Sequence, residues 1–363
     1  MKICFLAPSN SAHTKKWCKY FVSQGHEVHV VSFCDEEIDD VQLHYVSTGA
    51  NANGGDAQKL KYLLKAGAVR KIVKVIRPDI VNAHYATSYG AVAALAGLKN
   101  YALSIWGADI YDFPKKTALH RWMLQFSLHR AAHIFSTSKA MAEEAGKYTK
   151  KAIEITPFGV DMALFSPDKS TPCKDVFTVG TVKTLSPKYG IDYLLKAAAL
   201  IKEEHPEIPL KLRISGSGPN EQEYHALAEA LGIKEITTWL GFIPQEHAAQ
   251  EWAGMDVAVV PSTLESESFG VSAVEAQSSG CCCVISDIPG LMEATNPGKT
   301  SIVVPRRNER ALAEALVRLY NDPSLRKQMG TAGRAYVAQN YELMRCFKRI
   351  EVLFQHIAKA ERT

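Results

Sequence analysis

The sequence lacks the features that mark several large classes of protein. No apolar run reaches the ~18–20 residues that a membrane-spanning helix needs. The N-terminal stretch MKICFLAPSNSAHTKK shows no signal-peptide cleavage pattern. No repeat with a period of about 20–50 residues and no low-complexity segment occurs. We therefore expect a globular protein that works in the cytoplasm.

The common phosphate-binding loops are also absent. The turn after the first apolar segment, residues 8–16, contains no glycine, whereas a dinucleotide-binding oxidoreductase would need G-x-G-x-x-G there. No G-x-x-x-x-G-K-[ST] phosphate loop and no Asp-x-Asp metal motif occurs anywhere. The sequence therefore requires no metal, and we expect no cofactor.

The eight cysteines fit neither a zinc ribbon nor a disulfide framework. Three of them are consecutive, at positions 281–283, within an apolar segment. Adjacent side chains on a strand point to opposite faces of its sheet, so these three cannot converge on one metal. We expect them to pack in a core as small hydrophobic side chains.

Short β-rich segments alternate with amphipathic helical patterns along the 363 residues, of which 47% are hydrophobic. Continuous apolar strands with helical crossovers are typical of parallel sheets covered on both faces. The predicted strands lie at 2–7, 27–33, 41–46, 79–84, 102–106 and 133–137, and at 176–180, 210–215, 236–241, 257–262, 282–286 and 301–305. The fold class is therefore α/β, with two doubly wound, Rossmann-like domains.

The boundary between the domains is expected in TPFGVDMALFSPD, residues 156–168, which two prolines and a glycine interrupt. We predict an N-terminal, acceptor-side domain over 1–163 and a C-terminal domain over 164–340 that binds a nucleotide sugar. A final helix, 341–363, is expected to pack back onto the first domain. Ligands bind at the carboxyl ends of such strands, so two facing domains would form a central cleft.

The segment ESFGVSAVE contains two glutamates eight positions apart, Glu267 in a loop and Glu275 within a predicted helix. The backbone N–H groups of Phe269, Gly270 and Val271 would head that helix and form an anion site, with a phosphate as the usual occupant. Glu267 could reach hydroxyl groups beside the phosphate, and Glu275 could accept from both hydroxyls of a ribose. The alternative is a surface helix with two solvated glutamates.

The longer segment 261–294 resembles the signature of the family-4 retaining glycosyltransferases, which have the two-domain GT-B fold. Further elements of the family pattern are similar in the same order along nearly the whole chain. They are TPFGVD at 156–161, VGTVKTLSPKYGIDYLLKAAALI at 179–201, LRISGSGP at 212–219, WLGFIP at 239–244 and SIVVPRRNERALAEAL at 301–316.

The resemblance implies a site for a nucleoside-diphosphate sugar. Lys183 and Lys188 take the places of an Arg and a Lys that neutralise the leaving diphosphate, although the family usually has its Arg directly after the glycine and a Gly directly after the Lys. These two lysines and Glu267 are the expected catalytic residues. The resemblance assigns donor binding to Ser268, Phe269, Gly270, Val271, Glu275, Gly216 and Phe242, the last at the strand end that receives the base.

The first half offers five candidates for the acceptor side. His13 and Thr14 follow the first strand, His84 ends another, and Trp106 and Asp109 follow a third. Each has a structural alternative: helix N-terminal capping and a surface His for Thr14 and His13, capping of the following turn for Asp109, core packing for His84, and a place in the cleft wall for Trp106. Many family members have His at the position of Trp106, so no donor contact is transferred to it.

The charge is unevenly distributed. Residues 1–165 contain 20 Lys and Arg against 14 Asp and Glu, a net charge of +6, and the remainder has −2. Basic residues alternate with apolar ones in 57–77 and 115–130, a pattern that favours an anionic membrane surface or, alternatively, ordinary helices with a solvated face. Nucleic acid is not an expected partner, since no recognition motif accompanies the charge.

The predicted activity is retaining transfer of a hexose, from a UDP-sugar among the possible donors, to a hydroxyl acceptor. The expected acceptor is a lipid-linked or cell-surface polysaccharide precursor, reached by peripheral docking on the inner face of the cytoplasmic membrane. Two alternatives stay open. A nucleotide-sugar epimerase would form products from the donor alone, and a non-catalytic binding protein would bind the donor without turnover.

Overall fold

The computed structural model describes residues 1–49, 56–170, 173 and 175–360, with side chains in the second range from residue 60. The chain divides into two compact units. Unit 1 consists of Met1–Phe158 and Arg345–Thr363, and unit 2 of Gly159–Met344. The boundary therefore falls at 158/159 instead of 163/164. The reason is local. Val160 donates its N–H to the Tyr341 carbonyl at 2.8 Å, and its own carbonyl accepts from the Leu343 N–H at 3.0 Å. Tyr341 and Leu343 belong to unit 2, so these two hydrogen bonds join Val160 to that unit.

Unit 1 contains a seven-stranded parallel sheet in the order β3-β2-β1-β4-β5-β6-β7. Its strands are β1 Lys2–Leu6, β2 Glu27–Ser32, β3 Gln42–Tyr45, β4 Ile80–His84, β5 Ala102–Ile105, β6 His133–Ser136 and β7 Ile153–Ile155. Six of them match predicted strands. The seventh, β7, has only three residues, too few to show a periodic pattern.

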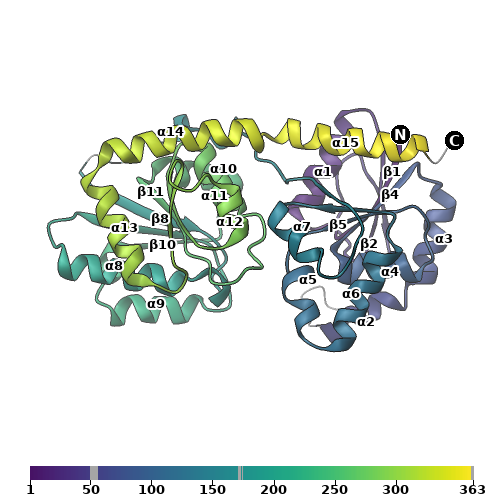
Figure 1. The fold of residues 1–363 in the computed structure, drawn as a ribbon, viewed down its shortest axis with the longest axis horizontal. Helices are drawn as coiled ribbons and strands as arrows, with labels where there is room; N and C mark the ends of the chain where they lie inside the picture. The colour runs from purple at the N-terminus through teal and green to yellow at the C-terminus, as the bar shows by residue number, and fades with distance from the viewer. Residues whose placement is uncertain (50–55, 171–172, 174, 361–363) are drawn as a thin grey trace. The chain divides into compact units, whose positions relative to one another are not determined.

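Helices cover both faces of this sheet (Figure 1). They are α1 Ala12–Ser23, α2 Asp56–Leu63, α3 Ala66–Ile76, α4 Gly90–Leu95, α5 Ala108–Tyr111, α6 Ala118–Arg130, α7 Lys139–Ala145 and α15 Leu343–Ala360, with the π-helical turn η1 Tyr85–Tyr89 and the 3-10 turn η2 Phe113–Lys115. The predicted helical stretch 57–77 is thus two helices. Leu64 lies in the turn that separates them, with 82% of its surface exposed.

The C-terminal helix α15 belongs to unit 1, as the yellow end of the ribbon shows in Figure 1. The buried Glu351 carboxylate accepts a hydrogen bond from the Tyr20 hydroxyl at 2.9 Å and lies 3.1 Å from His26 Nε2. The ring of Phe354 stacks on that of Phe21, with centroids 5.4 Å apart. Polar and apolar contacts together hold this helix on the sheet.

Unit 2 contains a six-stranded parallel sheet in the order β10-β9-β8-β11-β12-β13. Its strands are β8 Phe177–Val182, β9 Leu210–Ser215, β10 Thr237–Gly241, β11 Val257–Val260, β12 Cys282–Ser286 and β13 Ser301–Val304, all of them predicted. The helices are α8 Ile191–Glu204, α9 Glu221–Ala230, α10 Gln245–Gly254, α11 Val271–Ser278, α12 Pro289–Ala294, α13 Glu309–Asn321 and α14 Pro323–Asn340, with 3-10 turns η3 Pro167–Lys169, η4 Pro187–Tyr189 and η5 Lys234–Ile236.

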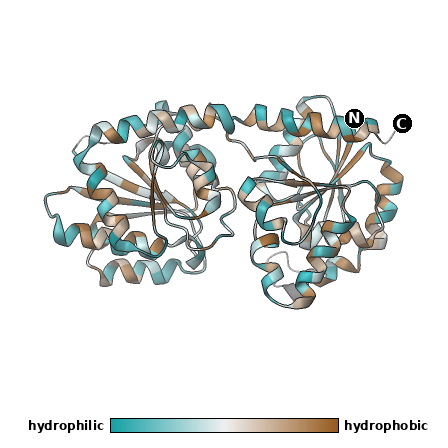
Figure 2. Cartoon of the chain, viewed as in Figure 1, coloured by the Kyte–Doolittle hydropathy of each residue, from teal (hydrophilic) through white to brown (hydrophobic). Residues whose placement is uncertain are grey.

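Both sheets are hydrophobic and their helices are mixed, as the brown strands and the alternating helix colours of Figure 2 show. Burying continuous apolar strands between two helical layers is the main stabilising contribution in each unit. Of the three consecutive cysteines, Cys281 is buried directly before β12, and Cys282 and Cys283 are buried within it. All eight cysteines are free thiols. The predicted doubly wound α/β class is therefore confirmed for both units.

Candidate active site

In unit 2, three loops follow the adjacent strands β8, β9 and β11 and carry most of the predicted residues. Lys183 directly follows β8, and its ammonium lies 3.0 Å from Glu267 Oε1, in the loop after β11. The side chains of this ion pair are only 10% and 8% exposed. Two opposite charges are thus held in contact at the carboxyl end of the sheet, away from most of the solvent.

Lys188 is attached to the same loop through the turn η4. Its ammonium donates to the Ser266 carbonyl oxygen at 2.9 Å, while its own carbonyl accepts from the Thr263 N–H at 2.8 Å. The ring of Tyr189 lies next to both lysines, with its centroid 4.7 Å from Lys183 Nζ and 5.3 Å from Lys188 Nζ. Both ammonium groups are therefore held beside one loop.

Helix α11 begins at Val271, the last of the three residues that the sequence places at its start. Gly270 precedes it with φ of +72°, a left-handed conformation that favours glycine, and the Ser272 hydroxyl donates to the Val182 carbonyl at 3.0 Å. The first backbone N–H groups of a helix have no intrahelical acceptors and carry partial positive charge. This helix start is tied by Ser272 to the end of β8, next to Lys183.

The remaining donor-side candidates occupy different environments. Ser268 and Phe269 are buried, and the ring of Phe269 packs edge-on against Tyr341 at 5.4 Å. Glu275 is half-buried on the second turn of α11. Phe242, by contrast, is 82% exposed after β10. Nothing in the described part of unit 2 covers most of this ring, so its apolar surface is available for contact with a ligand.

Gly216 is required by the close approach of two loops. Its φ is +136°, and a Cβ atom there would lie 1.8 Å from the Lys183 carbonyl oxygen. Its N–H donates to the Gly241 carbonyl at 2.7 Å, which joins this turn to the end of β10. The absence of a side chain at Gly216 therefore leaves room for the backbone of Lys183.

Three buried hydroxyl groups belong to residues next to the ion pair in the chain or in the sheet. Within the described part of the chain, the side-chain oxygens of Thr181, Ser215 and Ser266 are buried and have no hydrogen-bond partner. An unpaired buried hydroxyl costs free energy, and such groups call for an explanation such as a ligand or water. The ammonium groups, the helix start and these hydroxyls together form a site suited to a polar anion with neighbouring hydroxyl groups.

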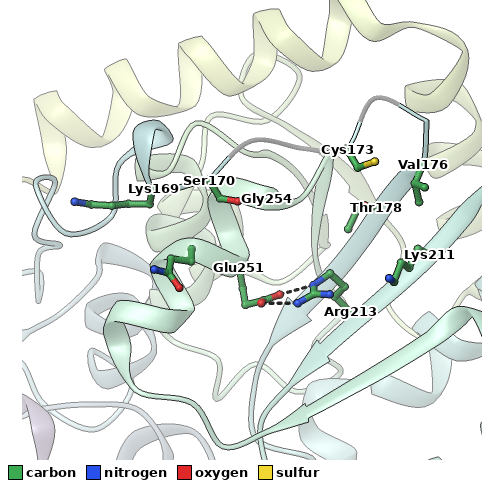
Figure 3. Close-up of a pocket in the computed structure, with 10 residues that line it drawn as sticks. Lys169, Ser170, Cys173, Val176, Thr178, Lys211, Arg213, Glu251 and Gly254 are labelled. Atoms are coloured by element: carbon green, nitrogen blue, oxygen red, sulfur yellow. Dashed lines mark hydrogen bonds and ion pairs between the residues drawn. The ribbon is translucent and has the colours of Figure 1, made fainter.

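A separate hollow of about 410 Å³ lies elsewhere in unit 2 (Figure 3). It is lined by Thr178 and Lys211, near the amino ends of β8 and β9, and by Arg213, whose guanidinium pairs with Glu251 at 2.6 Å. Ligands of open parallel sheets bind at the carboxyl ends of the strands. The hollow therefore lies at the wrong end of the strands to be the site described above.

In unit 1, three of the predicted residues form one aromatic cluster. The His13 ring stacks on Phe158 with centroids 3.9 Å apart and lies 5.7 Å from the ring of Trp106. His84 lies 4.2 Å from Trp106, centroid to centroid. Thr14 is buried on α1, and its Oγ1 has no partner among the described residues. The carboxyl ends of β1, β4 and β5 thus bring these residues together.

Both histidines of the cluster are held neutral. Burial, followed by the charge of Lys16, lowers the pKa of His13 to about 4. Burial, followed by His13, lowers the pKa of His84 to about 3. His84 Nε2 lies 2.9 Å from Asn82 Oδ1, while its Nδ1 is buried without a partner in the described structure. At neutral pH each ring can donate one hydrogen bond and accept another, but neither ring carries a charge.

Asp109 caps backbone instead of facing a ligand. Its carboxylate accepts from the N–H groups of Ala86 at 2.8 Å, Gly107 at 2.9 Å and Trp106 at 3.3 Å. Burial raises the pKa of Asp109, and these three hydrogen bonds oppose that shift. Of its two sequence interpretations, the geometry favours capping, because the carboxylate joins the loops after β4 and β5.

Two tyrosines near these sites were not selected from the sequence. Tyr85 has φ of +63°, rare for a bulky residue, and its ring lies 5.0 Å from Trp106. Tyr189 lies beside two of the three catalytic candidates of unit 2, Lys183 and Lys188. The strain at Tyr85 has no sequence signal. Tyr189 had one, since an aromatic residue stands where the family usually has Gly.

Two kinds of feature are absent from the described part of the chain. No group of three or more His, Cys, Asp or Glu residues there could hold a metal ion. None of the helices in those residues combines the length and the apolar character that crossing a membrane requires.

The fold is that of the GT-B enzymes. The sucrose-phosphate synthase of Thermosynechococcus elongatus superposes with a TM-score of 0.84 at 18% identity, over 99% of this chain and 100% of that one. The Anabaena protein HepE, solved with UDP-glucose, gives a TM-score of 0.78 at 18% identity, over 98% and 100%. At such identities the likeness concerns the fold alone.

Sequence comparison identifies the family. Residues 165–336 match the family described as Glycosyl transferases group 1, and residues 2–138 match Glycosyl transferase 4-like. A D-inositol 3-phosphate glycosyltransferase of Pseudarthrobacter chlorophenolicus is 30% identical over 295 residues, covering 73% of this chain and 67% of that protein. One from Kribbella flavida is 32% identical over 194 residues, 50% of this chain and 45% of that one. The chain belongs to the group 1 glycosyltransferases, which are retaining enzymes.

Proposed function

We propose that this glycosyltransferase moves a hexose from a UDP-sugar to a hydroxyl group, with retention of the anomeric configuration. The buried Lys183–Glu267 ion pair beside Lys188 and the start of α11 carries the proposal. It combines cations for a diphosphate with a carboxylate for sugar hydroxyls. UDP as the nucleotide is supported by HepE, a protein of the same fold that was solved with UDP and with UDP-glucose.

Each donor-side residue has a proposed role. Lys183, Lys188 and the N–H groups at 269–271 bind the diphosphate, and their charge stabilises the leaving group as it forms. Glu267 positions the hexose through its hydroxyls, with Ser268 in the same loop. Glu275 accepts from the ribose hydroxyls. The turn at Gly216 and the exposed ring of Phe242 receive the base.

The reaction needs no separate base. The acceptor oxygen bonds to the anomeric carbon on the face that the nucleotide leaves, and the bond from that carbon to the phosphate oxygen breaks. The acceptor proton passes to the departing phosphate oxygen. A glycoside and a nucleoside diphosphate result, and the protein supplies orientation and electrostatic stabilisation.

The acceptor is proposed to bind unit 1, at His13 and Trp106, whereas His84 has no exposed surface and packs behind them against the ring of Trp106. Aromatic faces pack against the apolar faces of sugar rings, and a neutral imidazole can accept from a hydroxyl group. Two acceptor classes have support. The first is a lipid-linked or envelope polysaccharide precursor. The second is a phosphorylated cyclitol, which the names of the D-inositol 3-phosphate glycosyltransferases suggest.

A lipid-linked acceptor is supported by the surface of unit 1. Leu64, Leu119 and Trp122 expose 82%, 63% and 59% of their surfaces, and Lys71 and Lys74 are exposed on α3. However, Val69, Val73 and Ile76 of α3 are buried, so apart from the exposed Val75 the outer face of this helix is mainly basic. We propose loose docking of a cytoplasmic enzyme on anionic lipid, at about 1 kcal/mol per basic residue near the surface.

A two-stage assay tests the proposed transfer. Calorimetry with UDP, GDP and ADP selects the nucleotide, and the matching hexoses are then incubated with lipid extract or with D-inositol 3-phosphate. Mass spectrometry should show one hexose added to one acceptor class, dependent on that acceptor. Free hexose or an isomerised donor without an acceptor would instead indicate an epimerase or a hydrolase. Nucleotide binding without any product would indicate a non-catalytic protein.

Liposome sedimentation tests the docking. The protein should bind vesicles with anionic lipid but not neutral vesicles, and high salt should release it because the Debye length shrinks. Charge reversal at Lys71 and Lys74 should weaken sedimentation and leave UDP affinity unchanged. Equal binding to both vesicle types, or to neither, would refute docking and favour a soluble acceptor.

A further inference from the structure

Tyr189 contacts both proposed diphosphate-binding lysines, although nothing assigns it a role. Lys183 Nζ lies 4.7 Å and Lys188 Nζ 5.3 Å from the centroid of its ring. Both distances are within the ~6 Å over which an ammonium group interacts favourably with an aromatic face. Burial, as the largest cause, raises the pKa of the Tyr189 hydroxyl, which is opposed by Lys183 and reinforced by Glu267.

The backbone on either side of this ring is constrained. The Tyr189 N–H donates to the Ser186 carbonyl at 3.0 Å, and the Thr263 hydroxyl donates to the Pro187 carbonyl at 3.0 Å. The Lys188 carbonyl accepts from the Thr263 N–H at 2.8 Å. The turn η4 is thus bonded to the loop that carries Glu267, which fixes the position of the backbone that carries the ring relative to that loop.

Two ammonium groups beside one ring repel each other, and long lysine side chains lose conformational entropy when they are held in place. The negative face of an aromatic ring offsets both costs, most strongly where solvent is excluded. Lys183 meets that condition, because its side chain is 10% exposed. A glycine at this position, as the family usually has, would provide neither effect.

We propose that Tyr189 is a positioning residue that pre-orients the ammonium groups of Lys183 and Lys188 for the diphosphate of the donor. The inference rests on the proposed function, since the lysines must bind that diphosphate. The ring face is the active part, and the hydroxyl is dispensable. The loop after β8 is longer here than in the family, and it carries Lys183 and Lys188 in place of the usual Arg and Lys-Gly. The ring of Tyr189 compensates for this change because it holds the two lysine side chains in position.

Binding of UDP, measured by calorimetry on the full chain, tests this role without knowledge of the sugar or the acceptor. Tyr189→Phe keeps the ring, and Tyr189→Leu removes it. Phenylalanine analogues with increasing ring fluorination, incorporated at position 189, keep the shape and weaken the negative face. Tyr193→Leu is the matched control, because Lys196 Nζ also lies 4.7 Å from the ring centroid of Tyr193, on α8.

We expect Tyr189→Leu to weaken UDP binding about tenfold, as the loss of two partly desolvated cation–π contacts implies. Tyr189→Phe should stay within about threefold of the wild type, and Tyr193→Leu should be unchanged. Affinity should fall steadily along the fluorinated series, which a purely steric role would not produce. A Leu variant that binds normally, a Phe variant as weak as Leu, or no trend with fluorination overturns the inference. Failure of the wild type to bind UDP would instead refute the proposed donor.

Discussion

Replacing Glu267 with Gln should destabilise unit 2 because it leaves the buried Lys183 ammonium without its counter-charge. The two charged atoms lie 3.0 Å apart. At an effective dielectric constant of about 20, their attraction is about 5.5 kcal/mol before desolvation is subtracted. Breaking a buried pair from one side typically costs ~3–5 kcal/mol. Since the amide oxygen of Gln can still accept a hydrogen bond, we expect the free energy of unfolding to fall by about 3 kcal/mol.

The assay is urea unfolding combined with hydrogen exchange of the segments 177–190 and 261–278. Glu229→Gln provides a matched control. Lys234 Nζ and Glu229 Oε1 lie 3.1 Å apart, a distance close to that of the buried pair, but the two side chains are 65% and 67% exposed. Exposed pairs contribute ~0–1 kcal/mol. Lys183→Met in the Glu267→Gln background should recover part of the loss, because the unpaired charge is then gone. Equal effects of the two Gln variants, or additive effects of Lys183→Met and Glu267→Gln, would refute the reasoning.

Three further changes have defined outcomes. Glu275→Gln should weaken UDP affinity at least about tenfold, since a hydrogen bond to a charged group contributes ~1.5–3 kcal/mol; unchanged calorimetry would exclude the ribose contact. Lys188→Ala should lower turnover about 10²–10³-fold with a smaller change in the donor KM, and turnover within a few-fold of the wild type would show that its charge does not stabilise the leaving group. Burial lowers the pKa of His84 to about 3, so the unfolded state binds the proton first as pH falls below about 6.5. The contribution of His84 to the stability of unit 1 should therefore be full above that pH and about 2 kcal/mol smaller at pH 5, and the contribution of His13 should fall in the same direction. His84→Gln should give a flatter profile than the wild type, and identical pH profiles of the two proteins would contradict this.

The strands other than β7, and their order of appearance, could be predicted because buried parallel strands are continuous apolar segments. The start of α11 could be predicted too, since Gly270 and Gly280 bracket the helix. The break between α2 and α3 could not. Apolar residues with helical spacing continue across Leu64 and Lys65, and sequence periodicity carries no information about a turn that packing imposes.

The candidate site could be predicted only as separate pieces. That Lys183 pairs with Glu267, 84 positions along the chain, depends on the neighbouring positions of β8 and β11 in the sheet. The capping role of Asp109 depends on the N–H group of Ala86, which belongs to the π-helical turn η1 after another strand, β4. Such long-range contacts follow from topology, and local sequence patterns do not specify them.

The anomeric configuration of the product tests the central claim most directly. A donor of known configuration, such as an α-linked UDP-hexose, is incubated with the enzyme and the acceptor found in the screen, and the product is assigned by nuclear magnetic resonance. The proposed mechanism predicts an α-linked product formed together with an equal amount of UDP. A β-linked product would require attack from the opposite face and a base, and would contradict the mechanism.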